Sequence, residues 1–164
     1  MPQRKARVDN GPQHDHAQCV GVALSTAESV CRERKLSLTP VRRRVLEIVW
    51  NSHEPVGAYD VLAKLARERR KAAPPTVYRA LEFLMSAGLV HRISSLNAFL
   101  GCAAPQRRHV AQFLVCRTCK RVAEIDEAAV PRLLARRAEA EGFQLEMTSV
   151  EVTGLCGDCR ARAA

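Results

Sequence analysis

Two pairs of cysteines have the spacing of metal ligands. Cys116 and Cys119 form one C-x-x-C motif, and Cys156 and Cys159 form a second. A tight turn places the two thiolates of such a motif at two vertices of a tetrahedron, and four thiolates close a structural Zn²⁺ site. Two redox motifs or incidental surface cysteines are the alternative, which the paired spacing disfavours. We therefore expect a structural zinc site in which the chain brings the second pair back to the first.

A second group of potential ligands is more widely spaced in the sequence. His91, Cys102, His109 and Glu124 offer two imidazoles, one thiolate and one carboxylate. Zn²⁺ accepts such a mixture, whereas Fe²⁺ generally prefers more oxygen and nitrogen. Residue type and spacing leave two interpretations open, a metal site or ordinary side chains, because a histidine at the end of a strand is usually only hydrogen-bonded.

The positive charge of the chain is concentrated in its first part. The 164 residues include 26 lysines and arginines against 17 aspartates and glutamates, which gives a net charge of +9. Residues 1–92 hold 16 basic and 9 acidic side chains, a balance of +7, and the remaining residues carry +2. This excess favours a polyanion such as double-stranded DNA as the partner of the first part.

Nothing in the sequence indicates a membrane or secreted protein. No apolar run approaches the roughly 18 residues that a membrane-spanning helix needs, and residues 1–20 lack the apolar stretch of a secretory signal. The seven cysteines fit metal ligation better than disulfides, because a reducing compartment disfavours disulfides. We expect a cytoplasmic protein with no membrane partner.

Periodicity divides the first part into helices and a hairpin. Apolar residues at three- and four-residue steps predict helices over 22–36, 40–50 and 58–69, with a polar turn at 51–57 between the second and the third. A fourth helix is predicted from residue 75, and Gly88 is expected to end it. Thr39 with Pro40 predicts the start of the second helix, and Pro74 with Pro75 prevents the third from continuing. Two β-prone runs at 89–93 and 98–100 predict a hairpin. This order predicts a winged helix whose fourth helix enters the major groove of DNA.

The second part predicts a small α/β domain. Strands are expected at 113–115, 122–125 and 143–152, with a helix over 130–141 and a bulge near Thr148 and Ser149. The fold class is therefore α+β. We divide the chain into a flexible tail at 1–20, a winged-helix DNA-binding domain at 21–101, a hinge at 102–108 and a zinc-binding dimerisation domain at 109–164.

Particular motifs carry a family resemblance. The runs AYDVL at 58–62 and PPTVYRAL at 74–81, followed by the two cysteine pairs, resemble the ferric uptake regulator superfamily and, within it, the zinc-sensing branch. The similarity extends from about Ala23 to Cys159. It implies a homodimer that joins an N-terminal winged helix to a C-terminal dimerisation domain and represses transcription when its sensing metal is bound. A zinc-dependent repressor of zinc-uptake genes is expected.

The resemblance also assigns the mixed ligands. His91, Cys102, His109 and Glu124 match the sensing ligands of the zinc regulators, which implies two zinc ions per protomer, one structural and one regulatory. An iron sensor is the alternative. Iron sensors carry a histidine-rich stretch before the first C-x-x-C and another histidine in the late strand, whereas this chain has only His109 in the first place and Thr148 in the second. Both differences favour zinc.

Candidate DNA contacts follow from the same match. Tyr59 and Arg79 fall on positions that read purines, and a guanidinium pairs well with O6 and N7 of guanine. Phosphate contacts are expected from four further residues, Thr76, Arg42, Arg43 and Arg44. A solvated helix face is the alternative for the arginine run.

Two other classes of function are alternatives to a DNA-binding regulator. A zinc enzyme is disfavoured because the H-x-E and P-C-x-x-C pattern of zinc deaminases is absent, so no catalytic residue and no small-molecule substrate are expected. A protein-interaction module that zinc stabilises, and whose positive charge is incidental, is the second alternative.

If zinc bridges the hinge, restricted motion of the two domains favours the dimer that fits DNA, typically by roughly 1 to 3 kcal/mol.

Overall fold

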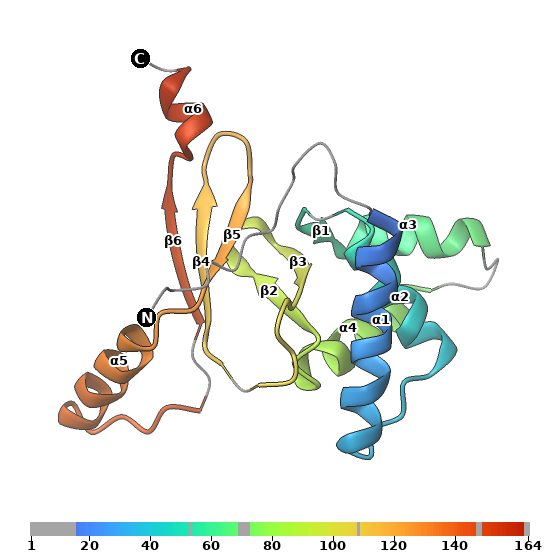
Figure 1. The fold of residues 1–164 in the computed structure, drawn as a ribbon, viewed down its shortest axis with the longest axis horizontal. Coiled ribbons are helices and arrows are strands. Elements are labelled where there is room, and N and C mark those ends of the chain that lie inside the picture. Colours follow the sequence, from blue (N-terminus) through green and yellow to red (C-terminus); the bar gives the residue numbers. More distant parts are fainter. Residues whose placement is uncertain (1–15, 53, 69–72, 108, 147–148, 163–164) are drawn as a thin grey trace. The chain divides into compact units, whose positions relative to one another are not determined.

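The computed structural model describes residues 16–52, 54–68, 73–107, 109–146 and 149–162. These residues form two compact units on either side of residue 108, here called the N-terminal unit and the C-terminal unit (Figure 1). Each unit mixes helices and strands, so the predicted α+β fold class is confirmed. The predicted tail at 1–15 lies outside the described residues.

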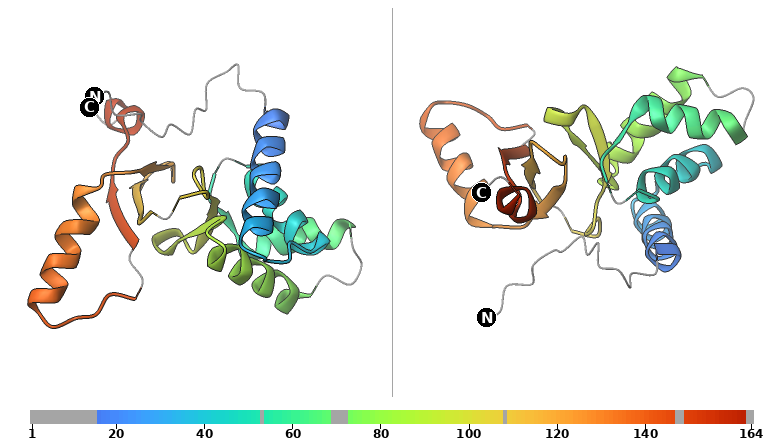
Figure 2. Two further views of the ribbon diagram at one scale, coloured as in Figure 1. Left: turned by 60° about the horizontal axis from the view of Figure 1, so that its bottom comes forward. Right: turned by 90° about the horizontal axis from the view of Figure 1, so that it is seen from above.

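Four helices build the N-terminal unit. They are α1 (His16–Glu33), α2 (Pro40–Trp50), α3 (Ala58–Glu68) and α4 (Pro74–Ser86). Helix α2 contacts the other three, and Figure 2 shows it among them in two further views. The buried core combines one face of each helix with residues of the adjoining sheet. The unit therefore packs around a single apolar core.

Helix α1 begins earlier than we predicted. It starts at His16, whereas the sequence pattern placed residues up to 20 in a flexible tail and began the helix at 22. Val20 is 7% exposed and Leu24 is 6% exposed, and the two lie one turn apart on the face that packs on the core. Burial of Val20 extends the helix by a further turn towards the N-terminus, which corrects the prediction for residues 16–20.

The ends of α2 and α4 follow local sequence signals. The Thr39 side chain accepts a hydrogen bond from the Arg42 backbone N–H at 3.4 Å, and Pro40 occupies the first helical position, as predicted. Gly88 ends α4 with φ of +70°. Its N–H donates to Met85 O, and the Leu89 N–H donates to Leu84 O, both at 2.9 Å. This pair of bonds is the Schellman motif, which requires the left-handed conformation that glycine adopts readily.

A three-stranded antiparallel sheet completes the N-terminal unit. Its strands are β1 (Val56–Gly57), β2 (Val90–Ile93) and β3 (Ala98–Gly101), in the order β1-β3-β2. The short 3₁₀ helix η1 (Ser94–Leu96) connects β2 to β3, which confirms the predicted hairpin. Strand β1 was missed, because a two-residue strand inside a polar turn has no measurable alternation. At Gly101 an added Cβ would lie 2.4 Å from the Trp50 ring, so this close approach needs glycine.

The C-terminal unit contains a sheet with both kinds of pairing. It consists of β4 (Ala111–Cys116), β5 (Val122–Ile125) and β6 (Ser149–Gly154), in the order β5-β4-β6, with helices α5 (Ala129–Ala140) and α6 (Gly157–Ala161). Strand β4 pairs antiparallel with β5 and parallel with β6. Helix α5 lies between β5 and β6 in the sequence, and the segment that joins β4 to its parallel partner β6 is long, as a parallel pair requires. Helix α6 was not predicted.

The last strand is shorter than we predicted. Residues 143–146 form no strand, and β6 begins at Ser149 because its partner β4 begins at Ala111 and the ladder opens with the pair Ala111 and Ser149. Residues 143–146 are paired with no strand in the described part of the chain. The predicted bulge near Thr148 and Ser149 falls partly outside the described residues.

The C-terminal unit exposes apolar side chains. None of the residues of α5 is buried. Leu133 is 55% exposed, Phe143 is 72% exposed and Val152 is 53% exposed. Within the described ranges, no helix is both long and apolar enough to span a bilayer.

Candidate metal centres and nucleic-acid interface

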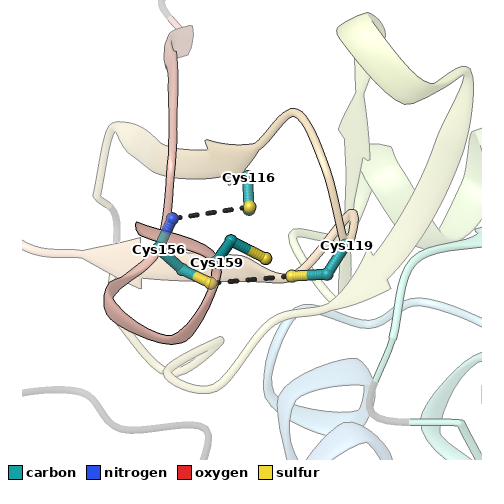
Figure 3. A group of neighbouring side chains, drawn as sticks. All are labelled: Cys116, Cys119, Cys156 and Cys159. Carbon is teal, nitrogen blue, oxygen red and sulfur yellow. Dashed lines mark hydrogen bonds between the residues drawn. The ribbon is translucent and has the colours of Figure 1, made fainter. Parts of the chain in front are cut away.

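The parallel pairing of β4 with β6 brings the two cysteine motifs together. Cys116 is the last residue of β4, and its partner across the ladder is Gly154, the last residue of β6. The Arg117 N–H donates to Gly154 O at 2.9 Å and closes this end of the ladder. Cys156 follows Gly154 by two residues, so it lies beside the first motif although 40 residues separate it from Cys116 (Figure 3).

Local turns then point all four sulfur atoms at one another. In the β4–β5 connection the Cys116 N–H donates to Arg121 O and the Lys120 N–H donates to Cys116 O, with Lys120 at φ +62°. Cys156 caps the N-terminus of α6, and Cys159 lies in its first turn. Each motif thus folds around its own tight turn, as the spacing predicted.

The sulfur geometry fits a tetrahedral ion. The four Sγ atoms lie within 4.8 Å of one another, and Cys119 Sγ is 3.6 Å from Cys156 Sγ. Sulfurs bound at roughly 2.3 Å to a tetrahedral Zn²⁺ stand about 3.8 Å apart. All seven cysteines are free thiols, so the described structure has no disulfide competing for them. The cluster is therefore a candidate metal centre held within one unit.

Backbone hydrogen bonds prepare one thiol of the cluster for ligation. N–H groups, first that of Cys119 and then that of Cys156, lower the pKa of Cys116 to about 5. Burial raises the pKa of Cys159 to about 11, and neighbouring thiols reinforce the shift. A cation shared by the four sulfurs would favour the thiolate form of each, because only deprotonated thiols ligate metal.

The N-terminal unit holds two of the four mixed ligands. His91 lies in β2 opposite Leu100 of β3, and Cys102 directly follows β3. The Cys102 N–H donates to Leu89 O at 3.0 Å, which fixes the start of the connector after β3. A ring nitrogen of His91 and Cys102 Sγ lie within 4.8 Å of each other. The hairpin therefore presents an imidazole and a thiol side by side.

The C-terminal unit holds the other two. Glu124 lies in β5 opposite Phe113 of β4, and His109 precedes β4. His109 Nε2 is 2.9 Å from Glu124 Oε1. Each unit thus supplies one pair of potential ligands, and the predicted assignment of all four to one regulatory ion stays a prediction.

Helix α4 presents polar side chains opposite its buried stripe. Val77, Ala80 and Leu81 face the core, whereas Arg79 is exposed on the other side. Tyr59, the second residue of α3, is 75% exposed. Thr76, in the first turn of α4, is half-buried. Arg79 and Tyr59 are thus accessible to a partner, as their predicted role requires.

The three arginines of α2 are engaged within the unit. The Arg42 guanidinium lies 3.7 Å from the centroid of the Phe83 ring and donates to Ser37 O at 2.6 Å. Arg43 Nε is 2.9 Å from Glu28 Oε1, and both side chains are nearly half exposed. These interactions leave Arg42 and Arg43 at the surface.

Arg44 is held more firmly than its neighbours. It pairs with Glu47 at 2.8 Å and with Glu68 through two of its nitrogens. The hydrogen bonds to Glu68, and next those to Glu47, raise the pKa of Arg44 further above its ordinary value. This geometry gives an ion pair between α2 and α3, and the phosphate contact that we predicted for Arg44 stays a prediction.

No pattern in the sequence indicates a role for Arg34. Its Nη1 donates to Ala87 O at 2.7 Å and its Nη2 donates to Pro105 O at 2.8 Å. The partners are 53 and 71 residues away along the chain. A contact between a side chain and distant backbone carbonyls leaves no periodic pattern, so only the folded structure reveals it.

A helical unit with a three-stranded wing, joined to a unit with a four-cysteine cluster, defines a metal-binding protein of the winged-helix class. Residues 33–153 match the model of the ferric uptake regulator family. The chain belongs to this family.

Similar proteins point to one branch of the family. The chain is 36% identical over 137 residues to the zinc uptake regulation protein of Escherichia coli, which covers 83% of this chain and 80% of that protein. A solved structure of a zinc uptake regulator complexed with zinc and DNA has 33% identity and a TM-score of 0.83, covering 88% of this chain and 98% of the other. A structure of holo XcZur has 43% identity and a TM-score of 0.77, covering 84% and 96%.

Proposed function

We propose that the chain is a zinc-responsive transcriptional repressor that binds operator DNA in the cytoplasm as a homodimer and represses zinc-uptake genes. The observation that carries the proposal is the presence of metal-ligand pairs in both units of a chain that also has a winged helix. The likeness to a regulator complexed with zinc and DNA supports the choice of metal and partner.

Two zinc ions per protomer form part of the proposal. The four cysteines hold a structural ion, for which the spacing of their sulfur atoms provides support. His91 and Cys102 from one unit share a regulatory ion with His109 and Glu124 from the other. A donor set that includes a thiolate suits zinc better than iron, which prefers harder ligands.

The proposed dimer forms through the C-terminal unit. Its exposed apolar side chains support this role, since surfaces of this kind commonly bind another protein. Leu133, Phe143 and Val152 are all more than half exposed. A second copy of the chain would cover them and leave the two winged helices free for DNA.

DNA recognition is assigned to the exposed side chains of α3 and α4. We assign base contacts to Arg79 and Tyr59, and phosphate contacts to Thr76, Arg42 and Arg43. Arg44 is left out because Glu47 and Glu68 already compensate its charge. Direct readout needs a side chain that can reach a base edge, and the exposure of Arg79 on α4 supports that role.

Regulation follows from the division of the mixed ligands. When His91 and Cys102 bind the same ion as His109 and Glu124, the relative motion of the two units is restricted. If the restricted arrangement sets the two α4 helices at the spacing of DNA half-sites, zinc shifts the population towards the DNA-binding form. The coupling expected is roughly 5- to 150-fold in operator affinity.

A titration of operator DNA across buffered free zinc tests the function. Wild-type protein should bind tightly when zinc-saturated and lose affinity as free zinc falls, while one zinc per protomer remains in the four-cysteine cluster. Cys102→Ser should remove this response without unfolding the protein. Cys19→Ser is the matched control, because Cys19 lies half-buried in α1 and belongs to neither ligand group.

Three outcomes would contradict the proposal. Operator affinity that does not depend on zinc in the wild type would remove the regulatory role. An unchanged response in Cys102→Ser would remove that ligand. Restoration of binding by Fe²⁺ but not by Zn²⁺ would favour the iron sensor instead.

A further inference from the structure

Arg34 holds two distant parts of the N-terminal unit together. It follows the last residue of α1, where the backbone is fixed by hydrogen bonds from Arg34 N–H to Val30 O at 3.1 Å and from Leu36 N–H to Cys31 O at 2.8 Å. The side chain therefore leaves from a rigid helix end. Its two terminal nitrogens donate to separate carbonyls, those of Ala87 and Pro105.

The first of these carbonyls belongs to the end of α4. Ala87 is the residue at the C-terminal cap of that helix, and a Cβ added to the adjacent Gly88 would lie 3.7 Å from Arg34 Nη1. The last carbonyls of a helix lack partners within the helix, and a positive charge there is favourable. Arg34 thus fixes the C-terminal end of the helix that carries Arg79.

The second carbonyl belongs to the connector that follows β3. This connector begins with Cys102, whose N–H donates to Leu89 O, and it is buried again at Pro105. The connector is consequently attached at two points to the turn between α4 and β2. One attachment is the backbone bond of Cys102, and the other is the side chain of Arg34.

A guanidinium is suited to this double contact. Its N–H groups point in fixed directions from a planar fork, so two carbonyls bound to different nitrogens keep a fixed separation. A lysine has a single flexible ammonium and cannot hold the same spacing. With the fork in place, displacement of the connector would be transmitted to α4 through both attachments, whereas without the fork only the backbone bond from Cys102 to Leu89 would remain.

We infer that Arg34 is a positioning residue that couples metal occupancy at Cys102 to the orientation of α4, and thereby to DNA binding. The inference rests on the proposed function, since it presupposes that zinc at Cys102 regulates DNA affinity. Among the described residues, the two hydrogen bonds of the Arg34 side chain end on backbone carbonyls and not on a candidate metal ligand or a candidate base-reading side chain. Its contribution lies in the linkage between them.

The test compares operator affinity with the regulatory site filled and empty, the structural zinc being retained. Arg34→Gln and Arg34→Lys are the variants, and Arg32→Ala is the matched control because Arg32 is exposed in the last turn of the same helix. In the Arg34 variants the ratio of the two affinities should fall on the order of two- to thirtyfold, the range for mutations that alter coupling. Affinity without regulatory zinc should stay within about twofold of wild type, and the control should keep the full ratio.

A second readout separates coupling from ordinary stabilisation. Operator DNA should tighten zinc binding at the regulatory site in the wild type by the same factor as zinc tightens DNA binding, and the variants should lose this effect in parallel. Circular dichroism and zinc content show that each protein is folded before it is titrated. If Arg34→Gln does not fold, Arg34→Lys is used instead, because it keeps the positive charge.

Two results would overturn the inference. If affinity drops equally with and without regulatory zinc, Arg34 merely supports the fold. If the variants keep the wild-type ratio, the linkage runs elsewhere. Absence of zinc dependence in the wild type is a different result, because it overturns the proposed function itself, and the inference falls with it.

Discussion

The four cysteines and the four mixed ligands differ in how the chain assembles them. All four cysteines belong to the C-terminal unit, where one parallel ladder and two tight turns bring their sulfur atoms within 4.8 Å. The mixed ligands come as two pairs, one from a hairpin of each unit. The first group can bind an ion while the two units stay independent, whereas the proposed regulatory ion requires both units. In the proposed assignment, a zinc ion bound by the four cysteines is structural and a second zinc ion bound by the mixed ligands is regulatory.

Breaking the cysteine cluster should have the largest effect. In Cys116→Ser we expect loss of one zinc per protomer and a large loss of stability in the C-terminal unit, because metal binding in small domains is coupled to folding. The melting temperature of that unit should fall by on the order of 20 °C. Zinc content and thermal unfolding followed by circular dichroism measure both quantities.

The mixed ligands provide the control for that experiment. Cys102→Ser should lose a zinc ion as well, yet keep the melting temperature of the C-terminal unit, since Cys102 belongs to the other unit. If Cys116→Ser retains both ions and its stability, the cluster is not a structural zinc site.

A pair of histidine substitutions should show whether the mixed ligands act as one site. His91→Ala removes a ligand from the N-terminal unit, and His109→Ala removes one from the C-terminal unit. Each alone should abolish most of the zinc-dependent gain in operator affinity, which is roughly 5- to 150-fold. The double variant should lose no more than either single variant, because one ion serves both residues.

Additive losses would break this interpretation. Two independent sites, one in each unit, would make the effect of the double variant equal to the sum of the two single effects in free energy. Operator affinity measured with zinc-loaded and zinc-depleted protein for all four forms decides between the two cases. Glu124→Gln gives an isosteric check on the partner that lies 2.9 Å from His109.

The cysteine cluster was predictable and the mixed pairs were not, for a physical reason. The C-x-x-C spacing is typical of a tight turn, so four consecutive residues are enough to predict that the thiols of Cys116 and Cys119 lie close together. The same holds for Thr39 and Pro40, whose local chemistry sets the start of α2. His91 and Cys102 are paired by a hairpin register instead, which spacing alone does not specify, so their assignment came from family resemblance.

Tertiary contacts account for the errors. Helix α1 extends to His16 because Val20 reaches the core, and β6 is short because β4 offers it only six partners. In each case the residues that pack on or pair with the segment are distant in sequence, so the local pattern of apolar and polar residues does not predict the contact.

The smallest effect should come from the ion pair outside the cysteine cluster. Arg121 Nη1 lies 2.7 Å from Asp158 Oδ2 and joins the β4–β5 connection to α6, but both side chains are more than half exposed. Exposed ion pairs contribute little because water and salt screen them. Arg121→Ala should therefore keep its zinc and show no resolvable change in melting temperature, in contrast to Cys116→Ser. Loss of zinc in Arg121→Ala would mean that the cysteines alone do not hold α6. The difference in stability between the four-cysteine site and the mixed-ligand site would then depend on surface charge instead of thiolate ligation.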